Sequence, residues 1–497
     1  LIVDLRLHDF VGGPGAYADR LHELRDELAA EHPAAPLPPH RELAEAAVHG
    51  LLAWHWVEGD PGYFLYTTPY DRSAEFNANN KGTTLGWHFE ALGFVGGFPV
   101  AFGLLWAAER LGDERARTVA LRCLERWCRD GQTDWGFFHT SYHPGPAQSI
   151  NGSYPNGPEE PFYGSCWLGD RRLLHARTTA DASFHLARCL QLLPADHPRR
   201  LSWTAALRRS LEAALSVQDA SGRFGQRYDH QARRVEQAEG SAGLLWIPAM
   251  ATALPLFVDD AAFVERLDVA LRVAGAGYAA DVEQGWIVGA PEDVDRAPTS
   301  EDGYNAVMAY AALHRRFGDG RWATLLQQAC DWTLAWRKAY NVRFSPNNVL
   351  TQADFRSVGG DFASSHNNHL HIYGCNCVAD FAYVDELAGT SRYRRRADEH
   401  VAYAAQLLCR DDGQWNGQRG MCSEQFYTSD WSIWGDWDPG EQHVQKGSFM
   451  GVSHVWCVNM ILLALEQYER CGALQELQGG TTQGLRPEGS GQFHPRK

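Results

Sequence analysis

A polar segment near residue 370 holds the densest group of side chains that could do chemistry. It reads His366-Asn-Asn-His-Leu-His-Ile-Tyr373 and follows Asp361. Asn and His side chains offer hydrogen-bond donors and acceptors that suit sugar hydroxyl groups, and His exchanges a proton near neutral pH. The structural alternative is a polar loop in which an Asn caps a helix and one His is buried. The residues expected to bind substrate here are His366, Asn367, Asn368, His369, His371 and Tyr373.

The acidic candidates for catalysis lie in separate loops. Glu301 and Asp302 follow Thr299 at the expected start of a helix, where Thr299 and Asp302 also fit a capping box. Glu424 is flanked by aromatic residues, which should raise the pKa of its carboxyl group and suit a general acid. Its alternative is an exposed loop acid. We expect the catalytic pair to come from Glu301, Asp302, Asp361 and Glu424.

Aromatic side chains are concentrated in two long loops, over residues 130–177 and 409–446. Aromatic faces can stack on the apolar faces of sugar rings, although the same residues could simply pack the loops together. Glu90 lies near the start of another expected helix, three residues after Trp87. The additional candidates for substrate binding are Trp87, Glu90, Tyr427 and Trp431.

The sequence predicts neither a metal ion nor an organic cofactor. His369 and His371 are two residues apart in a segment expected to be helical, where such residues point to different faces. Cys375 and Cys377 have no second pair at a zinc spacing. The phosphate loop G-x-x-x-x-G-K-[ST], the G-x-S-x-G elbow and the H-E-x-x-H motif are also absent from the sequence.

The elements that must position these residues are almost all helices, because apolar residues recur with helical periodicity along most of the chain. A first helix over residues 17–30 precedes a Pro-rich linker. Further helices are expected over residues 42–57, 86–111, 114–129, 179–193, 200–217, 241–257, 261–278, 300–317, 322–339, 368–387, 393–408 and 447–468.

Short turns and long loops alternate between these helices. Gly112, Gly318 and Gly389 mark tight helix-to-helix turns. Six hairpins that each bury one face are stable only when they stack in a ring with a shared core. We therefore expect the three glycines on the rim opposite His369. The long loops should lie at the N-terminal ends of the inner helices, where free N–H groups converge on one pocket.

This organisation resembles the (α/α)6 toroid of the six-hairpin glycosidase superfamily, over roughly residues 42–470. The segment from Ser216 to Gly225 ends a helix and continues as D-x-x-G-x-F-G, which is common in such proteins. The resemblance implies an all-α (α/α)6 toroid and a carbohydrate-active enzyme. The same fold also hosts polysaccharide lyases, sugar 2-epimerases and terpenoid cyclases, so the reaction must be argued from the site.

A shorter segment is similar to another family. Residues 367–371, followed by an apolar helix and a Gly-Thr-Ser-Arg-Tyr turn, resemble part of the N-acylglucosamine 2-epimerase-type isomerases. In that family histidines on the same toroid act as acid and base, so the resemblance implies the same role here.

Composition excludes several classes of function. The chain has 497 residues, with 45 Lys and Arg against 61 Asp and Glu, and the net charge of −16 argues against a nucleic-acid partner. No apolar run approaches the roughly 18 residues of a membrane helix. Eleven scattered cysteines indicate a reducing compartment, so we expect a cytoplasmic protein, or a secreted one if a signal peptide has been removed.

The expected regions are an N-terminal helix and linker over 1–40, the toroid over 41–471 and a polar tail over 472–497, and the oligomeric state is left open.

The combined prediction is a glycoside hydrolase that cleaves a neutral glycoside or oligosaccharide. It would use one carboxylic acid and one carboxylate base or nucleophile, without a metal or cofactor. The alternatives are a sugar epimerase or isomerase that uses His as acid and base, a polysaccharide lyase that uses Tyr and His, and a carbohydrate-binding toroid without catalysis.

Overall fold

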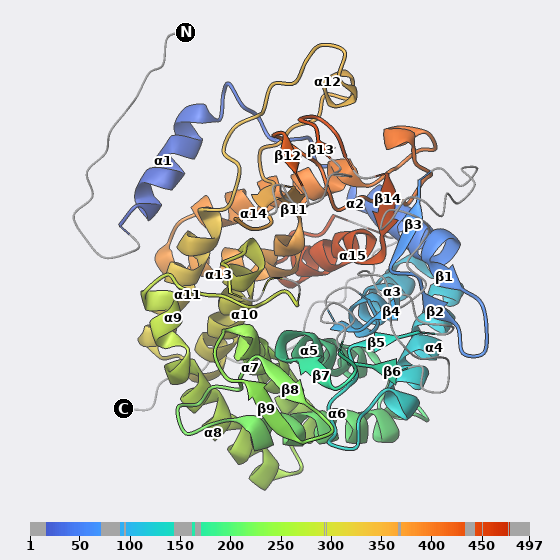
Figure 1. The fold of residues 1–497 in the computed structure, drawn as a ribbon, viewed down its shortest axis with the longest axis vertical. Coiled ribbons are helices and arrows are strands. Elements are labelled where there is room, and N and C mark those ends of the chain that lie inside the picture. The colour runs from blue at the N-terminus through green and yellow to red at the C-terminus, as the bar shows by residue number, and fades with distance from the viewer. Residues whose placement is uncertain are drawn as a thin grey trace.

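Two concentric layers of helices form a ring in the computed structural model (Figure 1). The structure describes residues 16–70, 90–93, 96–143, 162–164, 170–292, 294, 296–365, 369–432, 443–449, 451–475 and 477. Each inner helix contacts the next, and the last contacts the first, which closes the ring. The inner helices are α3 (Phe98–Leu111), α5 (Ala176–Leu192), α7 (Trp246–Ala253), α10 (Ser300–Phe317), α13 (Val378–Ala388) and α15 (Val455–Arg470).

The outer helices pair with the inner ones as antiparallel hairpins, except that α2 comes first in the chain and packs on the last helix, α15. Inner helices such as α5 are buried nearly all round because both faces are covered, whereas an outer helix such as α4 has one buried apolar stripe. The outer helices are α2 (His40–Gly50), α4 (Glu114–Asp130), α6 (Arg200–Val217), α8 (Ala261–Gly277), α11 (Gly320–Leu334) and α14 (Arg392–Leu407). The expected (α/α)6 toroid is confirmed.

Helix α1 (Ala18–Leu28) lies outside the ring, against α11 and α14 (Figure 1). Arg25 Nη2 is 2.8 Å from Glu399 Oε1, and both side chains are largely buried. Arg392 and Arg395 of α14 pair with Asp19 and Asp26 of α1. Charge pairs along one face therefore fix this N-terminal helix to the outer layer.

The three glycine turns end inner helices. Gly112, Gly318 and Gly389 have φ values of 71°, 68° and 66° and follow α3, α10 and α13. A left-handed residue just beyond the last turn stops a helix, and glycine adopts that conformation without strain. Because α10 has 18 residues, Gly318 lies about 25 Å from the start of that helix. The start of α10 carries Glu301, which pairs with His371, so this turn is at the opposite end of the ring from the histidines.

Short strands occupy the long loops before the inner helices. The sheets pair β1 with β2, β3 with β14, β4 with β5 and β6, β7 with β8 and β9, β10 with β11, and β12 with β13. Their bounds are β1 (Trp56–Val57), β2 (Tyr63–Phe64), β3 (Thr67–Pro69), β4 (Glu90–Ala91), β5 (Ser141–Tyr142), β6 (Phe162–Tyr163), β7 (Leu173–His175), β8 (Arg227–Asp229), β9 (Arg234–Gln237), β10 (Asp361–Phe362), β11 (Leu370–His371), β12 (Trp431–Ser432), β13 (His443–Val444) and β14 (Val452–His454).

Three inner helices begin later than the sequence predicts, because strands precede them. The helix expected from residue 447 begins at Val455, after β14 has paired with β3. The helix expected from residue 368 begins at Val378, after β11 and a 3-10 turn over Tyr373–Cys377. The helix expected from residue 86 begins at Phe98. Helical periodicity therefore identifies these helices, but not the strand-to-helix junctions that carry the polar side chains.

Shorter elements complete the described structure. They are a π-helical turn (Leu51–His55), 3-10 turns (Ala242–Leu245, Leu254–Phe257 and Gln414–Asn416) and the short helices α9 (Ala279–Glu283) and α12 (Val349–Gln352). Among the described residues, no helix combines the length and apolar character needed to span a bilayer.

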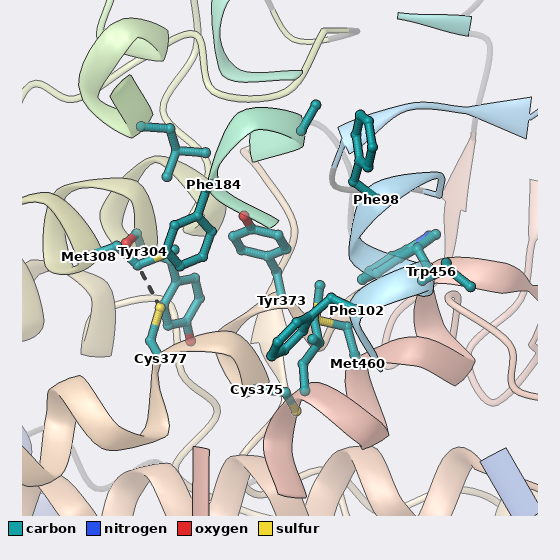
Figure 2. Close-up of a cluster of buried hydrophobic side chains, with 14 of the residues drawn as sticks. Phe98, Phe102, Phe184, Tyr304, Met308, Tyr373, Cys375, Cys377, Trp456 and Met460 are labelled. Carbon is teal, nitrogen blue, oxygen red and sulfur yellow. Dashed lines mark hydrogen bonds between the residues drawn. The ribbon is translucent and has the colours of Figure 1, made fainter. Parts of the chain in front are cut away.

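The middle of the ring is filled by large side chains from several inner helices (Figure 2). Phe102, Phe184 and Met308 come from α3, α5 and α10, and each is buried. Tyr373 and Trp456 complete this central plug at the ends nearer the strands, and they are no more than 1% exposed. The ring is therefore a packed core with two separate mouths rather than an open channel.

Candidate functional site

Two histidines face the same side of one extended segment. His369 forms a bridge with Tyr427, and His371 belongs to β11, which pairs with β10 in the register Asp361 to His371. In an extended chain, residues i and i+2 point to the same face. The expected separation of His369 and His371 onto different helix faces is therefore wrong, because the segment is a strand. Their ring centroids are 5.9 Å apart.

Glu424 is the centre of the first group. His369 Nε2 lies 3.4 Å from its Oε1, His454 Nε2 lies 3.3 Å from its Oε2, and Trp456 Nε1 donates to Oε2 at 3.4 Å. Although burial acts to raise the pKa of Glu424, the surrounding imidazoles overcome it and hold the pKa at about 2. The expectation that aromatic neighbours raise this pKa is therefore reversed, and Glu424 is an ionised carboxylate at neutral pH.

His454 fixes the orientation of Glu424. The Glu424 backbone N–H donates to His454 Nδ1 at 3.3 Å, so the proton of the neutral ring is on Nε2 and is donated to the carboxylate. His454 is 2% exposed, and burial lowers its pKa despite the nearby negative charge of Glu424. The ring therefore acts as a clamp between the backbone and the side chain of one residue.

Glu301 is the centre of the second group. Its Oε1 is 3.2 Å from His371 Nε2, and its Oε2 forms an ion pair with Arg177. Tyr373 N–H donates to His371 Nδ1 at 3.4 Å, so His371 presents its proton to Glu301 from Nε2. Arg177 lies over the ring of Tyr373, 4.5 Å from its centroid. An arginine, a carboxylate and an imidazole thus form one connected buried unit.

The two carboxylates have opposite pKa shifts. Burial raises the pKa of Glu301, the negative charge of Glu424 adds to the rise, and Arg177 opposes it. Burial also lowers the pKa of His371 to about 3, so this ring is neutral at physiological pH. Glu424 is the more exposed carboxylate, with 16% of its side chain exposed against 8% for Glu301. Glu424 is therefore the member of this cluster with the most exposed side chain, while His369 and His371 are buried behind it.

Asp302 and Asp361 have structural partners instead. The Asp302 side chain accepts from the N–H and hydroxyl groups of Thr299 and from the Ala290 N–H, which makes it the predicted capping box. Burial raises the pKa of Asp302 to about 7. Asp361 is 1% exposed and accepts from Arg337 Nε at 2.8 Å and Nη2 at 3.1 Å. The contacts of both carboxylates are thus within the core.

Glu90 is also held by core residues. Its Oε2 pairs with Arg126 at 2.5 Å and accepts the Phe64 N–H at 2.9 Å, and its Oε1 accepts from Trp127 Nε1 at 2.7 Å. Tyr427, in contrast, lies beside the site, with its ring centroid 6.4 Å from that of His369. Trp87, His366, Asn367 and Asn368 lie outside the described residues, as does the side chain of Trp431.

The sequence interpretation missed two residues of the site, His454 and Arg177. Each lies where a short strand passes directly into an inner helix: β14 into α15 and β7 into α5. His454 and His175 are the residues just before these helices, with closely similar extended backbone angles. The available signal was a His at the end of a β-type segment followed by a long apolar helix. It was overlooked because the two helices were expected to begin elsewhere.

His369, His371 and Glu424 also have the spacing of a cation site. One ligand atom each from His369, His371 and Glu424 lies within 4.8 Å of the other two. Two imidazoles and a carboxylate are donors that Zn²⁺ and Fe²⁺ accept. The proton position deduced above for His371 favours a hydrogen-bonded network instead, because its Nε2, the nitrogen that faces Glu301, carries a proton.

Comparison with known proteins shows the fold. No known family profile matches the chain, and neither does any curated protein. A D-mannose isomerase is similar with a TM-score of 0.54 at 7% identity, over 86% of this chain and 96% of that one. A cellobiose 2-epimerase from Spirochaeta thermophila has a TM-score of 0.51 at 12% identity, over 92% of this chain and 100% of that one. A family 76 glycoside hydrolase (mannosidase) from Bacteroides thetaiotaomicron has a TM-score of 0.50 at 11% identity, over 87% and 99%.

These likenesses place the chain among the (α/α)6 toroids, as the resemblance predicted. One of the three similar proteins is an isomerase, one an epimerase and one a hydrolase. The fold is therefore compatible with more than one reaction, and the choice depends on the site.

Proposed function

We propose that this protein is an enzyme that removes a proton from the carbon next to the carbonyl of a free neutral sugar and returns one, either to the neighbouring carbon as an aldose–ketose isomerase or to the opposite face of the same carbon as a 2-epimerase. The observation that carries the proposal is the pair of histidines on one strand face, each backed by its own carboxylate: His369 by Glu424, and His371 by Glu301. Isomerisation and 2-epimerisation both remove a proton from the carbon next to a carbonyl and return one, so each needs a base and an acid close together.

His369 is the proposed base. When it takes the proton from the sugar carbon, the ring becomes a cation, and the ionised Glu424 at 3.4 Å stabilises that charge. Because its pKa is about 2, Glu424 stays negative throughout and does not compete for the proton. His454 and Trp456 are positioning residues, since they hold Glu424 by N–H groups and reach the reaction through it.

The group around Glu301 is the proposed electrophilic side. A neutral His371 with a pKa of about 3 can donate a hydrogen bond to the oxygen of the ene-diol intermediate without losing its proton to solvent. Its Nε2–H is directed toward Glu301, so it would need to turn partly toward the substrate when the sugar binds. Arg177 holds Glu301 in place during that change.

Glycoside hydrolysis is the second candidate. The raised pKa of Glu301 and the depressed pKa of Glu424 are the division of roles that an acid and a base or nucleophile require. Against it, both oxygens of Glu301 already contact Arg177 or His371, so a proton on Glu301 would have to displace one of them to reach a glycosidic oxygen. The isomerase or epimerase proposal leaves the Glu301–Arg177 ion pair in place and requires only the neutral His371 ring to turn.

Deuterium labelling separates the candidates. The protein would be incubated in D2O with free mannose, glucose, fructose and cellobiose, and in parallel with aryl glycosides and neutral oligosaccharides. NMR would follow the C1 and C2 protons. We expect a new sugar isomer carrying deuterium at C2 or C1, and no such product with Glu424→Gln. Cleavage of a glycoside without carbon-bound deuterium would establish the hydrolase instead, and an unsaturated product absorbing in the near ultraviolet would establish a lyase.

A further inference from the structure

The ring has a cavity at the mouth opposite the histidines. It has a volume of about 370 Å³ and is lined by residues of α5, α7 and the 3-10 turn after it, α10, α13 and the turn before it, and α15. Arg177, beside the histidines, and Arg188, beside this cavity, are both on α5, about 16 Å apart along the helix. Phe184 and Met308 of the central plug line the cavity, while Tyr373 contacts Arg177 and Trp456 contacts Glu424 at the histidine site. The cavity and the histidine site are therefore separated by packed side chains, which Figure 2 draws.

Positive charge is concentrated at this cavity although the whole chain has a net charge of −16. Four arginines line it against two acids, Asp380 and Glu466. Arg315 pairs with Asp380, and Arg316 pairs outside the lining with Asp268 at 2.6 Å. The remaining lining arginines are Arg188 and Arg470.

Arg188 is buried and incompletely bonded. It is 6% exposed, and its guanidinium forms an ion pair with Glu466 through Nη2. Among the described residues, no hydrogen-bond acceptor reaches its Nη1. Its guanidinium carbon is 3.8 Å from the ring centroid of Phe102, which offers only a weak interaction to the charge. A buried guanidinium N–H without an acceptor is costly, so the site lacks an acceptor oxygen.

Arg470 adds an unpaired positive charge at the edge of the cavity. It is exposed, and it forms no ion pair with any residue in the described ranges. Burial lowers the pKa of Arg188, and the neighbouring charge of Arg470 lowers it further. Basic residues also compensate the negative ends of helices, which explains arginines in the last turns of α10 and α15. That compensation does not supply an acceptor for Arg188 Nη1.

We infer that this cavity binds a small phosphate-bearing anion, with the guanidinium groups of Arg188 and Arg470 as its ligands; Arg188 Nη1 is itself buried and turns toward the anion on binding. Arginine presents planar N–H donors that match phosphate oxygens, and a buried guanidinium strengthens that contact. The cavity volume falls in the range of small-ligand sites and exceeds what a phosphate group alone would fill. The inference is independent of the reaction proposed at the first site, because it uses residues at the opposite mouth.

The test is calorimetric titration of inorganic phosphate and of glucose 6-phosphate into the full chain at low ionic strength. Arg470→Gln should weaken binding about five- to tenfold, because one charged contact is lost. The matched control is Arg321→Gln, an exposed arginine at the same end of the ring that does not line the cavity, and it should bind like the wild type. Equal affinity for the two ligands identifies the phosphate ion, and tighter binding of glucose 6-phosphate identifies a phosphorylated sugar.

A second variant keeps the test informative if Arg188 alone is needed for folding. Arg188→Gln combined with Glu466→Gln exchanges the buried ion pair for a neutral amide pair and leaves the net charge unchanged. Phosphate binding should be lost while the melting temperature without phosphate shifts by only a few degrees. Unchanged phosphate affinity in either this variant or Arg470→Gln would overturn the inference. So would a heat of binding reproduced by sodium chloride at equal ionic strength.

Discussion

Replacement of Glu424 by Gln removes the charge at the centre of the histidine cluster and keeps nearly the same shape. Both carboxylate oxygens are used, Oε1 by His369 and Oε2 by His454 and Trp456. An amide has a single oxygen, so its NH2 group must face an N–H donor on one side. His454 cannot relieve the conflict by moving its proton to Nδ1, because that nitrogen accepts the backbone N–H of residue 424.

The magnitude follows from the pKa of Glu424. A shift from the ordinary value of 4.5 to about 2 corresponds to roughly 3 kcal/mol of folding free energy. Because the folded-state pKa lies below the unfolded one, this stabilisation is complete above about pH 5 and is lost as the pH falls toward 2. The variant lacks it, so the difference in stability between the two proteins should be about 3 kcal/mol at pH 7 and small near pH 2. Turnover should fall at least ~100-fold, because the imidazolium loses its counter-charge.

Urea unfolding from pH 2.5 to 7 would measure the stability difference, and initial rates on the substrate found by deuterium labelling would measure turnover. The matched control is Glu45→Gln, whose side chain is 40% exposed and pairs with Arg41 one turn away. It should change stability by less than about 0.5 kcal/mol at every pH. A stability difference for Glu424→Gln that is constant with pH, or a turnover near that of the wild type, would refute the role given to this carboxylate.

Four further outcomes are expected. Arg177→Met should lower turnover ~100-fold, since Glu301 loses its ion-pair partner and its pKa rises further, which a shift of the corresponding limb of the pH–rate profile to higher pH would report. Asp361→Asn should lower the free energy of unfolding by about 3–5 kcal/mol, because Arg337 stays buried without its carboxylate. The folded variant should keep its turnover, and a ~100-fold loss of turnover would instead show that Asp361 is catalytic. Gly318→Ala should destabilise by about 1 kcal/mol through its φ of 68°, with turnover unchanged because the turn is at the far rim; lost turnover would contradict that placement. Dialysis against a chelator should leave activity intact, whereas loss restored by one divalent ion would mark the histidine cluster as a metal centre.

The ring could be predicted from the sequence because the features that define it depend on residues that are close together in the chain. Apolar periodicity identifies a helix such as that over Ser300–Phe317, the alternation of short turns and long loops pairs the helices, and glycine after a helix marks a turn. The capping box of Thr299 and Asp302 is equally local, and the structure contains it as expected. Such features depend on residues within one or two turns of each other.

The candidate site was predicted only in part. Glu301, His369, His371 and Glu424 were all recognised as chemically capable, yet the sequence did not indicate that they form two His–carboxylate groups. Asp361 and Glu90 were equally plausible site residues from the sequence. In the structure, arginines on other segments pair with both of them in the core. The local sequence around a carboxylate does not distinguish one that is available for catalysis from one that forms an ion pair in the core.

The sequence by itself therefore determined the helices, their glycine turns and, through the ring that these imply, the all-α toroid. The tertiary structure decided which polar groups meet and in which protonation state. Glu424 illustrates the reason: its aromatic neighbours in the sequence suggested a raised pKa, but His454, thirty residues away, and His369, on another loop, hold it low. The pKa of a buried group depends on charges and N–H donors within a few ångströms, and which segments supply them is fixed only when strands such as β14 and β11 have paired and the ring has closed.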